Sequence, residues 1–379
     1  FYDSLLLASP SSIFNAENLG LMENGRGGFK LDEATNVDDS YQASSFLNAG
    51  YVQIDGKWKQ KIRLNGGLRV ESYRQAFNYI EFGSNLEKRI DTTVVDLLPS
   101  VNLIYSLSDK MKIRGSYYRT VSRPEFRELA PFEFEDFITN TLILGNPNLK
   151  RALINNFDVR YELYPTAGEI FSATAFYKNF KDPIEAVYLG GSNRTKSFLN
   201  VKSAVNYGIE LEFRKKLNFL NNFNALAWEG WDNFTIATNF ARIESSVDLR
   251  GNPNVQDSIR PLQGQSPYLI NFSALYDLPA KGLTATLLYN QIGRRVTFVG
   301  SLDQPDIYES SRPVFDFQLS KKFAKNRAEL RLNVQDILNQ TLYFYQNPDG
   351  NNNLDKAKDP FRLSRQTGTN IGISFSYSL

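Results

Sequence analysis

The chain has 379 residues, with 43 Lys and Arg against 41 Asp and Glu, and it contains no His and no Cys. Without these two residue types there can be no Ser-His-Asp or Cys-His hydrolase, no His- or Cys-ligated zinc site, no iron–sulfur cluster and no disulfide. The formal net charge of +2 provides no basic surface for nucleic acid, so we expect no nucleic-acid partner.

Apolar and polar side chains alternate with a period of two along much of the chain. The pattern is clearest in residues 61–71, 205–214 and 371–379. In 205–214 the apolar set is Val205, Tyr207, Ile209, Leu211 and Phe213, and the residues between them are polar or Gly. Successive side chains of a β-strand point to opposite faces, so this alternation predicts strands with one apolar and one polar face.

Weaker alternation predicts the remaining strands. In chain order they lie near 44–55 and at 95–107, 110–122, 152–164, 169–188, 233–247, 267–278, 283–298, 312–323 and 327–340. This makes about 13 strands, many of about 10 residues, whereas strands of globular proteins average about 5–6. One short helix is expected near 217–231, and no run reaches the ~18–20 apolar residues of a spanning helix. The fold class is all-β.

The connections between these strands alternate between short and long. Short turns are expected at 55–57, 108–109, 165–168, 279–282 and 324–326, and long loops at 76–94, 123–151, 248–266, 299–311 and 341–365. In an up-and-down antiparallel sheet every second connection lies on the same rim, so one rim carries turns and the other carries loops. The aromatic residues close to the turns, which suit an interfacial girdle, are Trp58, Tyr105, Tyr164, Tyr276 and Phe323.

These features favour a transmembrane antiparallel β-barrel over a soluble β-sandwich, whose strands also alternate. A barrel places the charges of its polar face in a wet lumen, where water satisfies them at little cost. The residues expected there are Arg63, Arg69, Glu71, Arg114, Arg160, Glu162, Glu210, Glu212, Arg214 and Arg331.

Seven segments resemble the barrel of TonB-dependent outer-membrane receptors. They are NGGLRVE at 65–71, LPSVN at 98–102, SRPEFREL at 122–129, GNPNLK at 145–150, AFYKNF at 175–180, YGIELE at 207–212 and NVQDILN at 333–339. The resemblance covers most of residues 40–379. It implies part of a 22-stranded barrel with an N-terminal plug, and import of a scarce nutrient such as a siderophore, glycan, peptide or cobalamin, with energy from TonB.

No segment resembles the plug, and an odd set of strands cannot close an antiparallel barrel. We therefore interpret 1–43 as a long extracellular loop region and strand lead-in, and 44–379 as the C-terminal strands of the barrel, with the plug outside this chain. The terminal Leu379 differs from the aromatic residue that the resemblance leads us to expect.

The resemblance also implies a set of partners. They are outer-membrane lipid of a Gram-negative bacterium, the protein's own N-terminal strands and plug, the TonB complex through a segment outside this chain, and a surface lipoprotein as a further candidate. We expect neither enzymatic activity nor a cofactor. A passive porin or adhesin on the same barrel, and a soluble β-rich binding or structural protein, remain open as alternatives. For the lumen charges, we favour contact with the plug over contact with substrate.

Candidate ligand contacts lie in the predicted long loops, where aromatic faces and amides suit a polar organic ligand. They are Tyr79, Phe82, Arg127, Asn146, Asn148, Asn252, Asn254, Tyr343, Tyr345, Asn351 and Asn353. Two other interpretations stay open. Arg127, Asn146 and Asn148 could instead belong to a structural element with Pro-terminated strands, and Tyr343 and Tyr345 to an outer aromatic girdle. Asp349, Asn351, Asn353 and Asp355 are spaced as in a calcium loop, but the loop lacks the usual Gly and Glu, so a solvated loop is favoured.

Overall fold

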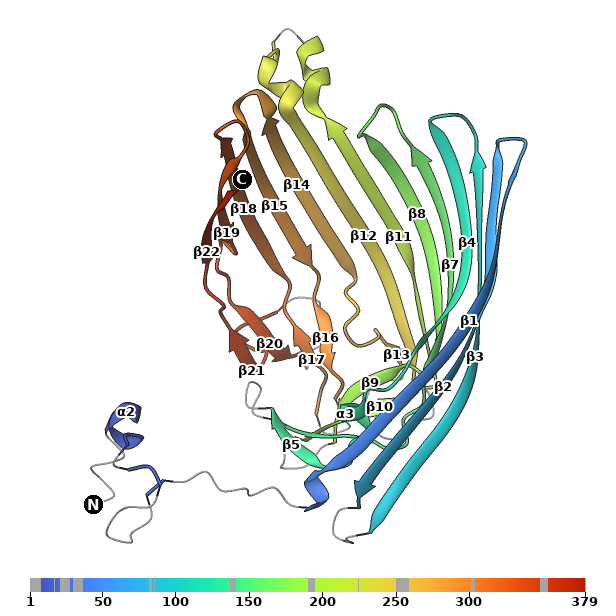
Figure 1. Ribbon diagram of the computed structural model, residues 1–379, viewed down its shortest axis with the longest axis vertical. Helices are drawn as coiled ribbons and strands as arrows, with labels where there is room; N and C mark the ends of the chain where they lie inside the picture. The colour runs from blue at the N-terminus through green and yellow to red at the C-terminus, as the bar shows by residue number, and fades with distance from the viewer. Residues whose placement is uncertain are drawn as a thin grey trace.

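One large antiparallel sheet, curved into a trough, forms the body of the protein (Figure 1). The structure is a computed structural model that describes residues 8–16, 18–20, 28–29, 37–81, 84, 86–136, 141–189, 195–223, 225–249, 259–300, 304–347 and 354–378. Thirteen of the 14 strands follow one another in a single path, and β13 (Ile259–Arg260) pairs with β12 beside this path. The strand number and the all-β class predicted from the alternation are therefore confirmed.

The strands of the path follow the chain order. They are β1 (Tyr41–Trp58), β2 (Ile62–Ile80), β3 (Glu87–Ser106), β4 (Met111–Ser122), β7 (Ala152–Leu163), β8 (Ile170–Lys181), β11 (Ser203–Lys216), β12 (Phe234–Asp248), β14 (Tyr268–Leu278), β15 (Leu283–Ile292), β18 (Arg312–Phe323), β19 (Ala328–Gln335) and β22 (Asn370–Tyr377). Apart from the short β13 beside β12, each pairs only with its neighbours in this order, so the sheet is an up-and-down meander.

The two rims of the trough differ as predicted, with two exceptions: the connection 217–233 on the upper rim is long, and the connection 81–86 on the lower rim is short. Turns at 59–61, 107–110, 164–169, 279–282 and 324–327 lie on the upper rim in Figure 1. In the last of these, Ala324, Lys325 and Asn326 all have positive φ. Strand β22 ends on the same rim, because Tyr377 pairs with Ala328. The lower rim carries the loops.

The loops of the lower rim contain structure of their own. It comprises helix α3 (Phe126–Leu129), the sheet of β5 (Glu133–Asp136), β6 (Thr141–Leu144), β10 (Thr195–Asn200) and β9 (Ile184–Tyr188), and the sheet of β16 (Arg295–Phe298), β17 (Ile307–Glu309), β20 (Leu342–Gln346) and β21 (Phe361–Arg365). The largest buried apolar clusters of the described chain lie at this rim, around Phe77, Val247 and Val296.

Several predicted boundaries were wrong, each for a local reason. Residues 55–57 lie inside β1, and the turn follows at Lys59 and Gln60, which both have positive φ. The predicted long loop 76–94 is mostly strand, because β2 and β3 stay paired from Ile62–Tyr105 to Ile80–Glu87. The connection between them is therefore 81–86.

Two predicted strands divide, and the predicted helix does not form as one unit. Residues 169–188 split at Asp182, which has positive φ, and Pro183. Residues 283–298 split at 293–294, and β19 stops before Asp336, which also has positive φ. In place of one helix near 217–231 there are two 3-10 helices, η2 (Leu217–Asn222) and η3 (Glu229–Asn233).

Three shorter helices complete the described elements: α2 (Pro10–Ile13), η1 (Val37–Asp39) and η4 (Pro279–Lys281). Among the described residues, no helix has the length and apolar character needed to cross a membrane.

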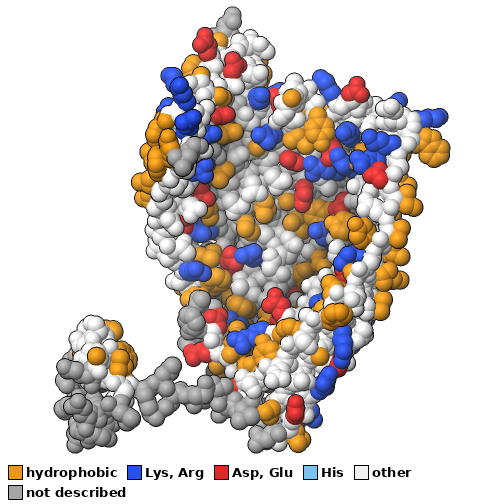
Figure 2. Space-filling view, viewed as in Figure 1, with side chains coloured by type: hydrophobic (Ala, Val, Ile, Leu, Met, Phe, Trp, Pro, Cys, Tyr) orange, Lys and Arg blue, Asp and Glu red, His pale blue; other side chains and the backbone are white. Residues whose placement is uncertain are grey.

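The two faces of the sheet differ in chemistry, as the alternation predicted. Ile209 is 50% exposed and Ile373 is 74% exposed on the convex side. Ile373 pairs with Leu332 there, and Ile209 pairs with Ala175 and, towards the loop rim, with Arg242. On the concave side acidic and basic residues gather along the wall, whereas apolar residues line the outer edges (Figure 2). A sheet with a continuous exposed apolar band on one face and charges on the other is suited to a lipid-facing wall.

Candidate functional site

The loop from Arg123 to Arg151 is folded back onto the concave face of β2 and β3. Arg123 donates a hydrogen bond to Glu71 Oε2 at 2.8 Å and another to Asp96 Oδ2 at 2.9 Å, and Arg151 also pairs with Asp96. The side chain of Asp96 is almost fully buried. Next to these ion pairs, the fully buried Phe77 packs against residues 129–132 of the same loop. The loop is therefore held over the rim by both charge and apolar contact.

Replacing Arg123 with alanine should loosen this loop. Hydrogen bonds to charged groups contribute about 1.5–3 kcal/mol each, and Arg123→Ala also leaves Asp96 with one cation fewer. We expect faster limited proteolysis between 124 and 150 in the full-length protein. Arg119→Ala is the matched control, because Arg119 donates to Asn155 on the convex face. Equal cleavage of the two variants would show that Arg123 does not hold the loop.

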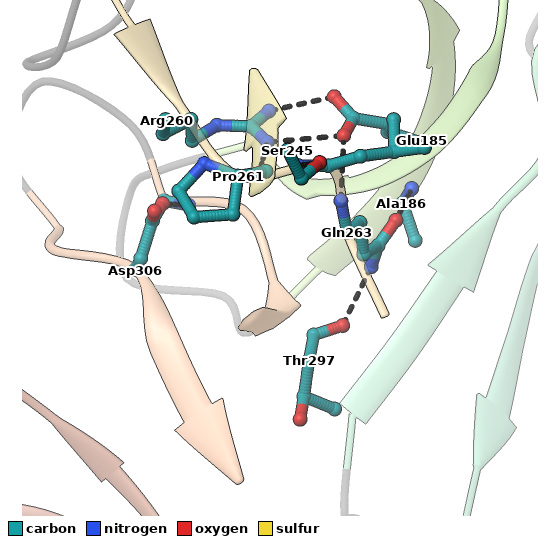
Figure 3. A network of polar contacts seen from close by, with 10 residues as sticks. Glu185, Ala186, Ser245, Arg260, Pro261, Gln263, Thr297 and Asp306 are labelled. Atoms are coloured by element: carbon teal, nitrogen blue, oxygen red, sulfur yellow. Dashed lines mark hydrogen bonds and ion pairs between the residues drawn. The ribbon is translucent and has the colours of Figure 1, made fainter. Parts of the chain in front are cut away.

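A buried ion pair joins two other connections of the lower rim (Figure 3). Arg260 donates to both carboxylate oxygens of Glu185, with Nη2 to Oε2 at 2.6 Å and Nη1 to Oε1 at 3.0 Å. Their side chains are 4% and 0% exposed. Burial alone would lower the pKa of Arg260, but its hydrogen bonds and charge attraction to Glu185 raise it above the ordinary value, so Arg260 stays protonated.

Gln263 extends this network to a third segment. Its backbone N–H donates to Glu185 at 3.0 Å, and its side-chain oxygen accepts the N–H of Ala186 at 2.6 Å. Its side-chain N–H donates to the carbonyl of Thr297 at 2.5 Å. Residues from β9, from the segment after β13 and from β16 are thereby fixed to one another, as Figure 3 shows.

Lys196 of β10 lies close to this network and is also buried. Its ammonium lies 3.7 Å from the centre of the Phe298 ring and 5.8 Å from that of Tyr188. Burial lowers the pKa of Lys196 to about 8, although the Asp136 carboxylate opposes that shift. The aromatic rings partly compensate for the loss of hydration.

The charges predicted to face the lumen form a ladder of ion pairs on the concave face. Arg114 pairs with Glu162 at 2.9 Å, Arg160 with Glu162 at 3.0 Å, and Arg160 with Glu212 at 2.6 Å. Further pairs join Arg69 to Glu71, Arg63 to Asp55 and Arg331 to Glu329. Glu210 and Arg214 lie on the same face of β11 as Glu212. That this face meets a plug stays a prediction.

The predicted ligand residues of the 123–151 loop have partners within the protein. The Arg127 guanidinium lies 3.8 Å from the centre of the Phe134 ring. Asn146 donates to the carbonyl of Phe198 at 2.8 Å and accepts the N–H of Asn148 at 3.0 Å. These contacts favour the interpretation that Arg127, Asn146 and Asn148 belong to a structural element and do not contact a ligand.

Of the other predicted ligand and calcium residues, some lie against the protein's own side chains and some lie outside the described residues. Tyr79 packs against Phe77, with the ring centres 5.6 Å apart. Phe82, Asn252, Asn254, Asp349, Asn351 and Asn353 lie outside the described residues. Asp355 accepts the backbone N–H of Ala357, and no group of three or more acidic residues suited to a metal ion occurs in the described parts of the chain.

Tyr343 and Tyr345 line one cavity of 570 Å³ at the lower ends of β14 and β18. The other residues of its wall are Arg242, Pro267, Tyr268, Arg294, Ser310, Ser311, Gln340, Thr341, Leu354 and Lys356. Tyr345 is almost fully buried, and Lys356 Nζ donates to the Tyr343 hydroxyl at 3.2 Å. The structure therefore brings these two predicted residues together.

Comparison with known proteins identifies the family. The model of the outer membrane protein beta-barrel family matches residues 12–377. The chain belongs to this family. It therefore lies in the outer membrane of a Gram-negative bacterium. The search of curated proteins returned no match.

Three solved uptake and transport proteins have a similar fold. The ferric yersiniabactin uptake receptor FyuA from Yersinia pestis is 14% identical, with a TM-score of 0.60 over 89% of this chain and 46% of that one. The ferric-catecholate import receptor Fiu from E. coli is 11% identical, with a TM-score of 0.62 over 93% and 48%. The copper transporter OprC is 15% identical, with a TM-score of 0.61 over 89% and 48%. The chain thus spans about half the length of these proteins.

Sequence reasoning did not find the most buried polar groups of this outer-membrane barrel. Glu185 and Arg260 are 75 residues apart in the chain, and each was predicted to lie in an ordinary strand end or loop. The one available signal was composition, because 259–263 combines Arg, Pro and Gln immediately before a strand. That signal does not specify a partner.

Proposed function

We propose that the protein containing this chain imports a scarce nutrient across the outer membrane, with energy supplied through TonB. The observation that carries the proposal is the combination of a charged concave wall with loops that are folded inward over one rim. Inward loops narrow the mouth of a barrel and can contact a solute before it enters. The solved proteins named above, a ferric yersiniabactin uptake receptor, a ferric-catecholate import receptor and a copper transporter, support the same class of function.

The nutrient that fits best is a polar organic molecule or a metal chelate of one. The rim offers tyrosine rings, amides and guanidinium groups, which hold such ligands by stacking and hydrogen bonds. In this proposal the charged groups of the concave wall also contact a plug.

Uptake by cells with and without a functional TonB tests the proposal. Cells that express the full-length receptor should accumulate labelled ferric chelates, copper or oligosaccharides only when TonB is intact. A passive porin would admit small solutes equally in both strains. Accumulation that is independent of TonB would contradict the proposed energy coupling.

Loop exchange tests where the ligand is recognised. Replacing residues 348–353 with a Gly/Ser linker of equal length should weaken ligand binding by on the order of tenfold or more, with the barrel still assembled. The matched control replaces Ala324, Lys325 and Asn326 with glycine, which accepts their positive φ without strain. Unchanged ligand affinity in the linker variant would remove this loop from the binding site.

A further inference from the structure

The concave face of β12, β14 and β15 has a different composition from the strands on either side of it. Paired residues of an antiparallel sheet share a face. Glu212 of the ion-pair ladder pairs with Asn239, and the same row continues to Asn271 of β14 and Asn290 of β15. At the concave positions of these three fully described strands the one charged residue is Asp277, beside the turn at 279–282. We call this surface the neutral wall.

Charged residues bound the neutral wall on both sides. Glu212 and Arg214 lie along the edge formed by β11, and the ladder continues from Glu212 to Arg160. On the other side Asp316 of β18 pairs with Leu288 of β15. The concave surface therefore contains a strip without fixed charge between two charged strips.

A cavity of 460 Å³ lies over the middle of the neutral wall. The residues of its lining that face the concave side include Asn239, Asn271, Ser273 and Asn290, with Glu212 and Asp316 at the two edges. Next to the asparagines, the small side chains of Ala237 and Ser273 pair with each other. The neutral wall therefore leaves room in the lumen for a solute.

The three asparagines form a row of carboxamides across this cavity. Asn290 Nδ2 donates to Asn271 Oδ1 at 2.7 Å. Each Asn side chain carries two N–H donors and an oxygen that accepts two hydrogen bonds, so this one bond leaves most of the capacity of the row for other groups. Hydroxyl and amide groups suit such a row, because they also donate and accept.

A neutral wall also suits passage better than a charged one. Hydrogen bonds between neutral groups are weaker than those to ionised groups. A site on a transport path has to bind a solute well enough to admit it and weakly enough to release it. The carboxamide row meets both requirements, whereas a solute on the ladder would compete with ion pairs such as Arg160–Glu212.

We propose that the nutrient crosses the barrel along the neutral wall, and that Asn239, Asn271 and Asn290 transiently bind its uncharged hydroxyl or amide groups. The plug then keeps its contact with the charged strands while the solute passes on the other side. This inference rests on the proposed function, because it requires a solute that is carried through the lumen.

Labelling of single cysteines in the full-length receptor tests the path. The chain has no Cys, so Ser273→Cys places one thiol on the neutral wall. The matched control is Thr174→Cys on the concave face of β8, where Thr174 pairs with Glu210; both residues are half-buried. Any cysteine outside residues 1–379 is replaced by serine. The probe is a small membrane-impermeant maleimide, added to cells supplied with ferric chelates, copper and oligosaccharides.

We expect intact TonB to accelerate the labelling of Ser273→Cys by on the order of tenfold, because a path that is closed at rest opens during import. Labelling of Thr174→Cys should not change. If uptake depends on TonB and Thr174→Cys is accelerated as much as Ser273→Cys, or neither variant is accelerated, the path does not follow the neutral wall. If no supplied nutrient enters in a TonB-dependent manner, the proposed function itself fails, and this inference fails with it.

Replacement of the carboxamide row gives a second test. Asn239→Leu/Asn271→Leu should slow TonB-dependent uptake by on the order of tenfold, because two hydrogen-bonding side chains are lost from the path. Binding of the imported nutrient at the cell surface should keep its affinity, because the loops are unaltered. Asn239→Gln/Asn271→Gln retains both amides and should retain most of the uptake. Proteolysis of each variant verifies that the barrel is assembled, and an unchanged uptake rate in the leucine variant would overturn the proposal.

Discussion

Arg260→Met should destabilise the loop assembly of the lower rim by about 3–5 kcal/mol, because it leaves the buried Glu185 carboxylate without its cation. The backbone N–H of Gln263 would still donate a hydrogen bond to that carboxylate. Segments 184–188 and 295–299 should then exchange their amide hydrogens much faster in the full-length receptor, whereas exchange within β11 should not change.

The double variant Glu185→Leu/Arg260→Met is the control for this prediction. Apolar residues of similar volume can replace a buried ion pair at little cost, so the double variant should recover most of the protection. If Arg260→Met alone leaves the exchange of both segments unchanged, the ion pair does not join the loops. If the double variant is as unstable as the single one, the loss of stability in Arg260→Met comes from the changed shape of the side chain and not from an unpaired charge.

Leu211→Arg should lower the stability of the barrel in lipid by about 2–4 kcal/mol, because it places a guanidinium on the lipid-facing side near the middle of β11. The adjacent Glu210→Arg places the same group on the concave face and should cost about 0.5 kcal/mol or less. Folding of both variants into lipid vesicles against urea measures the difference. Equal effects at the two positions would mean that the faces have been assigned the wrong way round.

The number, order and sidedness of the strands could be predicted from the sequence because each depends on local alternation. In β11 the exposed Ile209 and the ion-paired Glu212 occupy the two faces that their parity predicts. Strand ends were less predictable, since a single residue with positive φ, such as Asp182 or Asp336, ends a strand whose side-chain pattern continues.

The loop contacts could not be predicted, for a different reason. Whether Asn146 contacts a ligand or the carbonyl of Phe198 depends on a fold that brings residues 52 positions apart together. The same applies to Asp96, whose partners Arg123 and Arg151 are 27 and 55 residues away. Side-chain type restricts the chemistry of such residues, but only long-range packing selects the partner.

The buried network of Glu185, Arg260 and Gln263 restricts how this barrel can acquire a new specificity. A loop that contributes one half of a buried ion pair cannot be exchanged alone, because the incoming loop would leave the other half without its counterion. The connections β8–β11, β12–β14 and β15–β18 therefore have to come from the same protein for the network to form. A chimera that takes only the β8–β11 or only the β12–β14 connection from a relative should fold poorly, and a chimera that takes all three together should fold as well as either parent.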